Sequence, residues 1–516
     1  MRHGIICFLF LCLLLWTACA KDNIVLVDPV VVNEEEDHME NTTFDRFVSI
    51  TFSADGDAEV SGLSDSITAS IHGNKVTLTN LSNECVQYEL SGSSTDGFFK
   101  LYSDRKQAII LNGLNLTNPN GAAINVQNKR TYLVVNGDNS LADGTNYSNT
   151  PSDEDEKAAL FSEDQLIISG EGNLTINATG KSGIAVDDYL RILGRPTLHI
   201  NVSGNAYYDD VDQEYKGNAG VKLNGDFILD DGSLSITNSG TGGKGITSDG
   251  NGYFYGGTVT VNTTGNNYGN SGGWGNTSSS SVSAKGIKFD GNLLVAGGKI
   301  LVNCHAHEGI EAKGTLTISG GEVYSYSAAD DAINAGGDFT INGGMVYGYA
   351  SNNDGLDANG DFYVNGGVVY AIGANSPEVA LDANTEGGHQ LYVNGGVLIA
   401  IGGLENGASF SQSCFQASSW SQNTWYELSI GSTNYAFKTP SNGGTPLVVS
   451  GASTPTLKAG VTVSDGDSCF EGLFYADAST SGGQSVSLTS YTGGNGGGGG
   501  PGGGGGGGNG PGGGPF

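Results

Sequence analysis

The sequence predicts an all-β chain: a right-handed, single-stranded parallel β-helix with a small C-terminal β cap. Three observations lead to this fold class, namely a fixed repeat, period-two alternation within the repeat, and paired glycines at one place in it. The pairs begin at Gly297, Gly320, Gly343 and Gly366, each 23 residues after the one before. A fixed period of this size is typical of stacked repeats, in which each unit is stabilised by its neighbours.

Each repeat contains three short alternating runs. The five clearest copies read GIKFDGNLLVAGGKILV from Gly286, GIEAKGTLTISGGEVYS from Gly309, AINAGGDFTINGGMVYG from Ala332, GLDANGDFYVNGGVVYA from Gly355 and ALDANTEGGHQLYVNGGVLIA from Ala380. Alternation of period two predicts strands with one buried face. Paired glycines let the chain bend where a Cβ would clash. One repeat is therefore expected to form one coil, with three strands and three turns.

The chain divides by composition into five segments. We expect a lipoprotein signal peptide over 1–18, an acidic tether over 19–50, the β-helix over 51–403, a β cap over 404–492 and a flexible Gly-rich tail over 493–516. The apolar run at the N-terminus is too short to span a membrane. The cap is expected because the open end of a β-helix exposes unpaired strand edges. The acidic run of 34–37 has no core pattern and is expected to be solvated.

The end of the apolar run, LLLWTAC, resembles a bacterial lipobox. The resemblance implies that Cys19 becomes the lipidated first residue of the mature protein, which is then anchored to the membrane. Lys21 and Asp22 resemble the short charged signals that direct some lipoproteins to the cell surface. We therefore expect an outer membrane lipoprotein that is exposed at the cell surface. An ordinary cleaved signal peptide with an incidental cysteine is the alternative.

Charge and cysteine content exclude some functions. The formal net charge is −32, from 54 acidic against 22 basic residues, which argues against nucleic acid because that affinity comes largely from Lys and Arg. The acidic balance suits cation binding, or simply solubility. The widely spaced cysteines that remain after the leader form no disulfide framework. Whether Cys414 and Cys469 pair is left open, and Cys304, near His305 and His307, is expected in a coil wall and not in a zinc site.

Stacking brings distant residues together in columns about 4.8 Å apart from coil to coil. The position before each Gly-Ile unit is occupied by Lys244, Lys285, Glu308, Asp331 and Asp354. The position two after the glycine is occupied by Lys222, Thr247, Lys288, Glu311, Asn334, Asp357 and Asp382. Both columns change sign between the coils that begin at Gly286 and Gly309. A basic patch is therefore expected to pass into an acidic one along a single edge.

The acidic part of this edge has the ligand chemistry that Ca²⁺ prefers. Ca²⁺ takes six to eight oxygen ligands from carboxylates, amides and carbonyls. The candidate metal ligands are Glu308, Glu311, Asp330, Asp331, Asn334, Asp354, Asp357 and Asp382. An acidic, solvated ladder without any metal is the alternative.

Three insertions are expected on the same edge. They lie near 142–157, 205–218 and 266–284, and all interrupt the turn that leads into the Gly-Ile strand. Insertions on one face of a repeat protein often form its binding face, and flat aromatic rings suit sugar rings. The candidate carbohydrate-binding residues are Lys244, Lys285, Lys288, Tyr207, Tyr208, Tyr268 and Trp274, with an outward column of Tyr324, Tyr347 and Tyr370. Surface decoration, and plain stacking of that column, are the alternatives.

A resemblance to a known family rests on NSLADG from Asn139, AALFSEDQLIISGEGNLTI from Ala158 and the repeated G-I/L-x-A units. Together these resemble a family of secreted bacterial β-helix proteins over roughly residues 55–460, similar in shape to pectate lyases. The resemblance implies carbohydrate binding, bound calcium, and affinity for acidic and cellulosic polysaccharides.

The sequence therefore favours a non-enzymatic, monomeric surface protein that binds an acidic polysaccharide with the help of Ca²⁺. One alternative is a calcium-dependent polysaccharide lyase, in which Lys313 or Lys288 would be the base that removes a proton next to a uronate carboxylate. Another is a structural or adhesive surface protein, because fold alone does not determine function.

Overall fold

The computed structural model describes residues 35–127, 129–147, 151, 154–210, 213–269 and 281–493, and this part of the chain is all-β, as predicted. Its helical content is four 3₁₀ turns, η1 (Glu35–Asp37), η2 (Met39–Asn41), η3 (Thr385–Gly387) and η4 (Phe470–Gly472). None of its helices has the length and apolar character needed to cross a membrane.

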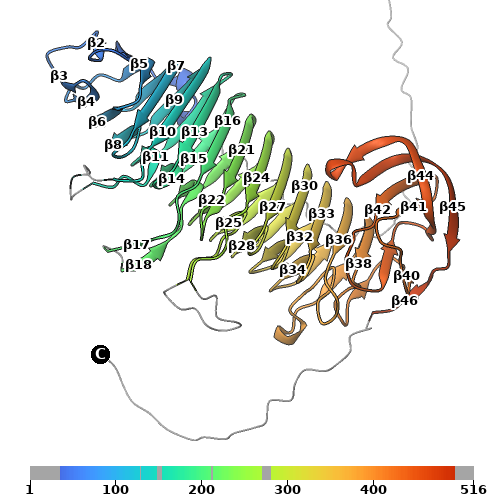
Figure 1. Cartoon of the computed structure of the whole chain (residues 1–516). Helices are drawn as coiled ribbons and strands as arrows, with labels where there is room; N and C mark the ends of the chain where they lie inside the picture. The colour runs from blue at the N-terminus through green and yellow to red at the C-terminus, as the bar shows by residue number, and fades with distance from the viewer. Residues whose placement is uncertain are drawn as a thin grey trace, which may run out of the picture. The chain divides into compact units, whose positions relative to one another are not determined.

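Most strands pair in parallel and form three columns that run along the stack of coils (Figure 1). The first column contains β3 (Ile67–His72), β4 (Asn74–Asn80), β6 (Gly97–Ser103), β8 (Ile124–Gln127), β11 (Ala158–Ser162), β14 (Ser182–Val186), β19 (Ala219–Leu223), β22 (Lys244–Ser248), β25 (Ile287–Phe289), β28 (Ile310–Ala312), β31 (Ile333–Ala335) and β34 (Leu356–Ala358). The second contains β1 (Arg46–Phe52), β5 (Val86–Ser94), β7 (Gln107–Asn118), β9 (Thr131–Asn136), β12 (Leu166–Gly170), β15 (Leu190–Ile192), β20 (Phe227–Leu229), β23 (Gly252–Phe254), β26 (Leu293–Val295), β29 (Leu316–Ile318), β32 (Phe339–Ile341), β35 (Phe362–Val364), β37 (Leu391–Val393) and β39 (Ser409–Phe410). The third contains β10 (Asp138–Asp143), β13 (Asn173–Ala178), β16 (Thr197–Val202), β21 (Ser233–Asn238), β24 (Thr258–Thr263), β27 (Lys299–Cys304), β30 (Glu322–Ser327), β33 (Met345–Ala350), β36 (Val368–Ile372) and β38 (Val397–Ile401).

The register between coils follows the sequence repeat. Ile310 in β28 pairs with Ile333 in β31, which pairs with Leu356 in β34. This pairing is consistent with the solenoid that the repeat predicts, and the right-handed sense of its winding stays a prediction.

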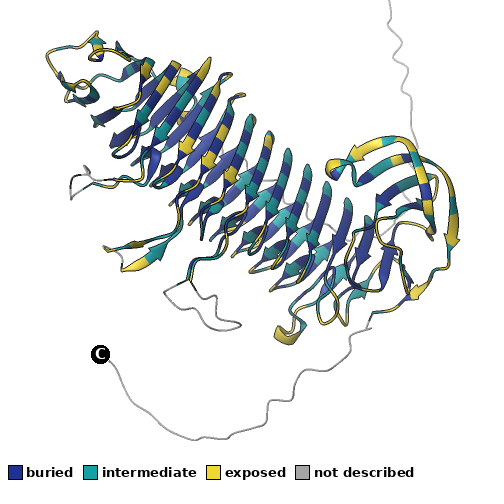
Figure 2. Cartoon of the chain, in the orientation of Figure 1, coloured by how far each residue is buried: buried dark blue, intermediate teal, exposed yellow. Residues whose placement is uncertain are grey.

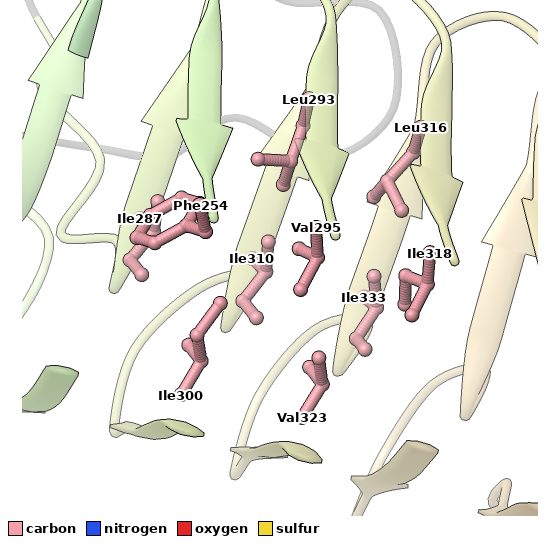
Figure 3. Close-up of a pocket in the computed structure, with 10 residues that line it drawn as sticks. All are labelled: Phe254, Ile287, Leu293, Val295, Ile300, Ile310, Leu316, Ile318, Val323 and Ile333. Atoms are coloured by element: carbon pink, nitrogen blue, oxygen red, sulfur yellow. The ribbon is translucent and has the colours of Figure 1, made fainter. Parts of the chain in front are cut away.

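The interior is filled by stacked aliphatic side chains. Figure 3 shows Ile287, Ile310 and Ile333 from successive coils of the first column, facing the Leu and Val side chains of the second column. The cavity among them has a volume of about 10 Å³, at the lower limit for a single water molecule. The inside of the stack is therefore a packed core, and any ligand has to bind outside it.

The paired glycines are required by the close approach of coils. Gly344 has φ of 80°, a backbone conformation that other residues rarely adopt. A Cβ at Gly344 would lie 2.8 Å from the carbonyl oxygen of Gly321 in the preceding coil. The repeat therefore keeps glycine here because both the backbone conformation and the space demand it.

The acidic segment before the first coil is docked, in contrast to the solvated tether expected over 19–50. Asp37 in η1 is fully buried, with its carboxylate 3.0 Å from Arg130 and 3.1 Å from Arg191. A run of acidic residues looks solvated in sequence, but Arg130, just before β9, and Arg191 in β15 supply partners that the sequence pattern does not show. The first 34 residues, including the expected signal peptide and Cys19, lie outside the described residues.

The smaller elements flank or close the stack. They are β2 (Glu59–Ser61), the hairpin of β17 (Tyr207–Asp209) and β18 (Glu214–Lys216), the closing strands β40 (Cys414–Ala417), β43 (Leu447–Ser450) and β46 (Thr489–Tyr491), and a closed barrel of β41 (Trp425–Ile430), β42 (Thr433–Lys438), β44 (Thr456–Cys469) and β45 (Phe474–Val486). β43 pairs antiparallel with β38 and so covers the last edge of the third column. The tail from residue 494 lies outside the described part.

The barrel packs on the last coils through an apolar cluster that joins Ile399 and Ile401 to Phe437 and Phe474. Figure 2 shows dark-blue buried segments on both sides of this contact. All four cysteines of the described chain, Cys85, Cys304, Cys414 and Cys469, are free thiols, so Cys414 and Cys469 do not pair.

Candidate functional site

The edge where the third column leads into the first carries the charged columns that the sequence predicts. Lys288 in β25 is in register with Glu311 in β28, which is followed by Asn334 in β31 and Asp357 in β34. A bridge between Leu356 and Leu381 continues the column to the coil of Asp382. The inward neighbours are buried and these residues are only partly exposed, because alternation turns every second side chain outward.

At the change of sign the opposite charges pair with each other. Lys285 Nζ lies 3.0 Å from Glu308 and 2.5 Å from Glu311, and the side chains of all three are 12% exposed or less. Burial disfavours the ammonium, but the charges of Glu308 and Glu311 outweigh it and raise the pKa of Lys285. Lys285 is therefore engaged by protein carboxylates, contrary to the expectation that it contacts carbohydrate.

A histidine neutralises the next carboxylates. His307 Nδ1 lies 2.8 Å from Asp330 and also contacts Glu308. Burial works against the charged ring, but hydrogen bonds that Asp330 and Glu308 accept from it raise the pKa of His307 to about 9. One ligand atom from each of these three residues lies within 4.8 Å of the others. Because Lys285 and His307 already balance their charge, Glu308, Glu311 and Asp330 are poor candidates for the predicted cation site.

Four carboxylates beyond this point have no basic partner among the described residues. We call Asp331, Asp354, Asp357 and Asp382 the carboxylate ladder. Asp331 and Asp354 are 6% and 9% exposed. Asn334 ties the ladder together, because its Nδ2 donates to Asp331 at 3.2 Å and to Asp357 at 2.6 Å. Glu378 and Glu405 add further negative charge near its end.

The ladder is electrostatically unfavourable when its groups ionise without a cation. Burial, helped by neighbouring carboxylates, raises the pKa of Asp354 to about 8, of Asp357 to about 6 and of Asp382 to about 11. Burial together with Asp357, Asp330 and Asp354 raises the pKa of Asp331 well above its usual value. Like charges at this spacing repel by about 1 kcal/mol even in water.

The donor atoms of the ladder are of the chemical type that a hard divalent cation takes. However, the described acidic and histidine side chains whose ligand atoms all lie within 4.8 Å of one another are His307, Glu308 and Asp330, and Asp338, Asp361 and His389, not those of the ladder. The donor set of the ladder consists of carboxylate oxygens, with the amide oxygen of Asn334 and backbone carbonyls close by, and such oxygens are what Ca²⁺ takes. Of the eight ligands predicted from sequence, the structure leaves Asp331, Asn334, Asp354, Asp357 and Asp382 available for it.

On the other side of the sign change the edge forms a groove with a volume of about 560 Å³. We call it the lysine groove, because five lysines line it: Lys157, Lys216, Lys222, Lys244 and Lys288. Lys244 and Lys288 were predicted as binding residues, whereas Lys157 and Lys216 were not. The insertions bring these two in, and the column pattern gives no sign of how an insertion folds.

The hairpin β17–β18 forms one wall of the lysine groove and carries tyrosines. Tyr215 lies in the groove lining, and its ring centroid is 5.0 Å from that of Tyr208 and 5.1 Å from that of Tyr268. The structure thus brings two of the predicted loop tyrosines together around Tyr215. Tyr207 packs against Lys181, and Trp274 lies outside the described residues.

The prediction that an outward tyrosine column forms a sugar platform is wrong for two of its three members. Tyr347 and Tyr370 are 3% and 0% exposed, because the barrel covers the third column at the last coils. Tyr347 packs against Phe470, and the hydroxyl of Tyr370 donates to the carbonyl of Lys438. Tyr324 stacks on Tyr347 at 4.8 Å and stays half-buried.

The two lysines considered as a lyase base share one carboxylate. Lys288 and Lys313 lie 2.8 and 2.7 Å from the same oxygen of Asp290. The hydrogen bond that Lys313 donates to Asp290 raises the pKa of Lys313. A lysine held protonated in this way is a poor proton acceptor.

The fold and the site define an all-β, parallel-strand solenoid with a charged edge that loops overhang. A family model described as "Carbohydrate-binding domain-containing protein" matches residues 72–332, about half of the chain. The chain belongs to this family of carbohydrate-binding domain-containing proteins.

Two further proteins are similar to it. A protein of the same description from Acetivibrio thermocellus is 32% identical over 113 residues, which make up 21% of this chain and 40% of that protein. The match thus spans well under two thirds of the relative. A solved structure, described as the polysaccharide lyase-like protein from C. thermocellum in a gadolinium derivative, covers 58% of this chain and 99% of its own at 20% identity and a TM-score of 0.39. That similarity is too weak to carry an inference.

Proposed function

We propose that this protein binds an acidic polysaccharide without cleaving it, with Ca²⁺ held by the carboxylate ladder. The observation that carries the proposal is the ladder itself, a row of two buried and two partly exposed carboxylates without a basic partner in the described chain. Membership in a carbohydrate-binding family supplies the class of ligand.

The residues have separate tasks in this proposal. Asp354 and Asp357 would hold the cation from one coil, and Asp331 from the preceding coil and Asp382 from the following coil would complete its oxygen ligands. When bound, Ca²⁺ would supply positive charge that draws a uronate carboxylate to an otherwise repulsive surface. Val379 N donates to Asp354 Oδ1 at 2.6 Å and so fixes that carboxylate in place.

Binding is favoured over cleavage because Lys244, the lysine whose pKa burial lowers to about 7, lies in the lysine groove and not beside the ladder. Lys288 and Lys313 are held by Asp290. A lyase remains the alternative function, and new ultraviolet absorbance from an unsaturated product would reveal it.

We further propose that the protein is a monomeric, right-handed β-helix lipoprotein, anchored through Cys19 in the outer membrane and displayed at the cell surface. This rests on the sequence of the leader and the short charged pair after it.

Isothermal titration with polygalacturonate tests the function. The chain without its leader, from residue 20 onward, is titrated in Ca²⁺ and again in EDTA. We expect calcium-dependent heat, no unsaturated product, and loss of the calcium-dependent part in Asp354→Asn/Asp357→Asn. Heat without any change in EDTA contradicts the role of Ca²⁺. No heat across a panel of acidic and neutral glycans favours an adhesive protein.

A further inference from the structure

The lysine groove contains two lysines that form no ion pair within the described part of the chain. Three of its lysines have carboxylate partners: Lys157 with Asp187, Lys216 with Asp209 and Lys288 with Asp290. Lys222 and Lys244 also line the groove, yet neither makes an ion pair or a side-chain hydrogen bond with any residue that the structure describes. Both are partly buried.

The fold places these two side chains together. Lys222 is in β19 and Lys244 begins β22, the next strand of the first column, where Ala219 pairs with Lys244. The two residues therefore belong to adjacent coils, and their side chains meet the same groove. The hairpin β17–β18 overhangs them, since Glu214, Tyr215 and Lys216 form part of the lining.

Uncompensated lysines are costly inside a groove, because burial disfavours charge and like charges repel. Burial lowers the pKa of Lys244 to about 7, helped by Lys288, Lys285 and Lys222 and opposed by Glu311. Burial also lowers the pKa of Lys222, together with Lys216 and Lys157, and against Asp249 and Asp187. An anion in the groove would relieve both effects.

We propose that the lysine groove is a metal-independent subsite for one anionic group on a sugar, either a uronate carboxylate or a sulfate ester, held by Lys222 and Lys244. The inference rests on the proposed binding of acidic polysaccharide and divides it into two contacts, one through Ca²⁺ on the ladder and one direct. The groove volume of about 560 Å³ falls in the range of small-ligand sites. An ammonium is a compact point charge, so it accepts either anion, and Tyr215 offers a ring beside it.

The test measures binding in EDTA, where the ladder cannot contribute through Ca²⁺. The chain from residue 20 is titrated with oligogalacturonate, with sulfated dextran and with unmodified dextran. The variant is Lys222→Gln/Lys244→Gln. The matched control is Lys75→Gln/Lys299→Gln, which removes the same charge from lysines on the outside of the coils, 35% and 41% exposed.

We expect the wild type to bind one or both anionic probes in EDTA and not dextran. The groove variant should bind at least about tenfold more weakly, as the loss of a charge-assisted hydrogen bond implies, while the control binds like the wild type. Which polymer binds decides between carboxylate and sulfate. Affinity should also fall as pH rises through 7 to 8, because an anion favours the protonated form of Lys244.

Three results would overturn the subsite. The first is equal weakening in the groove variant and its control, and the second is binding in EDTA that the groove variant leaves unchanged. The third is binding only with Ca²⁺, which leaves the proposed function standing without the subsite. Failure to bind any glycan with or without Ca²⁺ would overturn both. Thermal unfolding in EDTA checks the variant, which should be no less stable than the wild type because it removes two unbalanced charges.

Discussion

The lysine groove and the carboxylate ladder lie on the same edge and are built on the same backbone repeat, but they differ in sign. Among the residues that the structure describes, Lys222 and Lys244 in the groove have no acidic ion-pair partner, whereas Asp331 and Asp354 in the ladder have no basic one. Where the two regions meet, the charges of the two columns pair with each other through Lys285. The repeat thus fixes where a side chain lies, and each coil sets the charge independently.

The comparison teaches where binding is to be expected. Lys285, Glu308, Glu311, His307 and Asp330 satisfy one another, so this junction stabilises the fold. The regions to either side hold charges that the fold does not satisfy, and both are partly shielded from water. Unbalanced buried charge is unfavourable for the free protein, so these two regions are the places where a ligand of opposite sign gains most.

Among single substitutions, the junction gives the largest expected effect. Lys285→Gln leaves two buried carboxylates without their ammonium and should lower the free energy of unfolding by about 3 kcal/mol, measured by urea unfolding at neutral pH. The control Lys313→Gln removes a lysine that is 53% exposed. It should change the free energy of unfolding by less than about 0.5 kcal/mol. Equal effects of the two substitutions would mean that the junction is not a stabilising contact.

The ladder should respond to Ca²⁺. At 100 times its Kd, Ca²⁺ should stabilise the wild type by about 2.7 kcal/mol. Asp354→Asn should respond much less, although in EDTA it is more stable than the wild type because it relieves like-charge repulsion. Asn keeps Oδ1 to accept from Val379, so the backbone contact survives. The exposed Asp55→Asn is the control, and melting curves with and without Ca²⁺ measure both. A full Ca²⁺ response in Asp354→Asn contradicts the assignment.

In EDTA, stability should fall by roughly 4 kcal/mol or more as pH rises from 5 to 8. The sign follows from raised pKa values in the folded state, about 6 for Asp357 and about 8 for Asp354. The folded chain retains protons that the unfolded chain has lost above its usual carboxyl pKa, so each rise in pH through these values favours unfolding. His307, with a pKa of about 9, acts in the same direction at higher pH. Stability that rises over this range would contradict the account of the ladder.

The smallest effect concerns the wall of the groove. Tyr208, which is 43% exposed, should tolerate substitution by Ala with a change in unfolding free energy below about 0.5 kcal/mol. The same variant should lose about 1 kcal/mol of polysaccharide binding, the size of one aromatic contact. Titration with and without EDTA should give the same loss, because the ring packs on Tyr215 in the groove lining and not on the ladder. A loss of polysaccharide binding that appears only with Ca²⁺ would mean that the groove and the ladder act as one binding site.

Sequence periodicity could predict the coils, the register of Lys288, Glu311 and Asp357, and the change of sign, because these depend on a repeated backbone. It could not predict that Lys285 reaches across to Glu308, since a long side chain is free to point to either neighbour. The burial of Tyr370 and of Asp37 depends on the barrel and the N-terminal segment, which belong to no repeat. The groove was missed for the same reason, as its wall is an insertion.

The measurement that most directly tests the division of this edge is calorimetric titration of Ca²⁺ into three chains without glycan. These are the wild type, Lys222→Gln/Lys244→Gln and Asp354→Asn/Asp357→Asn. The account predicts that the wild type and the lysine variant bind Ca²⁺ and that the aspartate variant does not. Binding of Ca²⁺ to the aspartate variant with unchanged affinity would contradict the account.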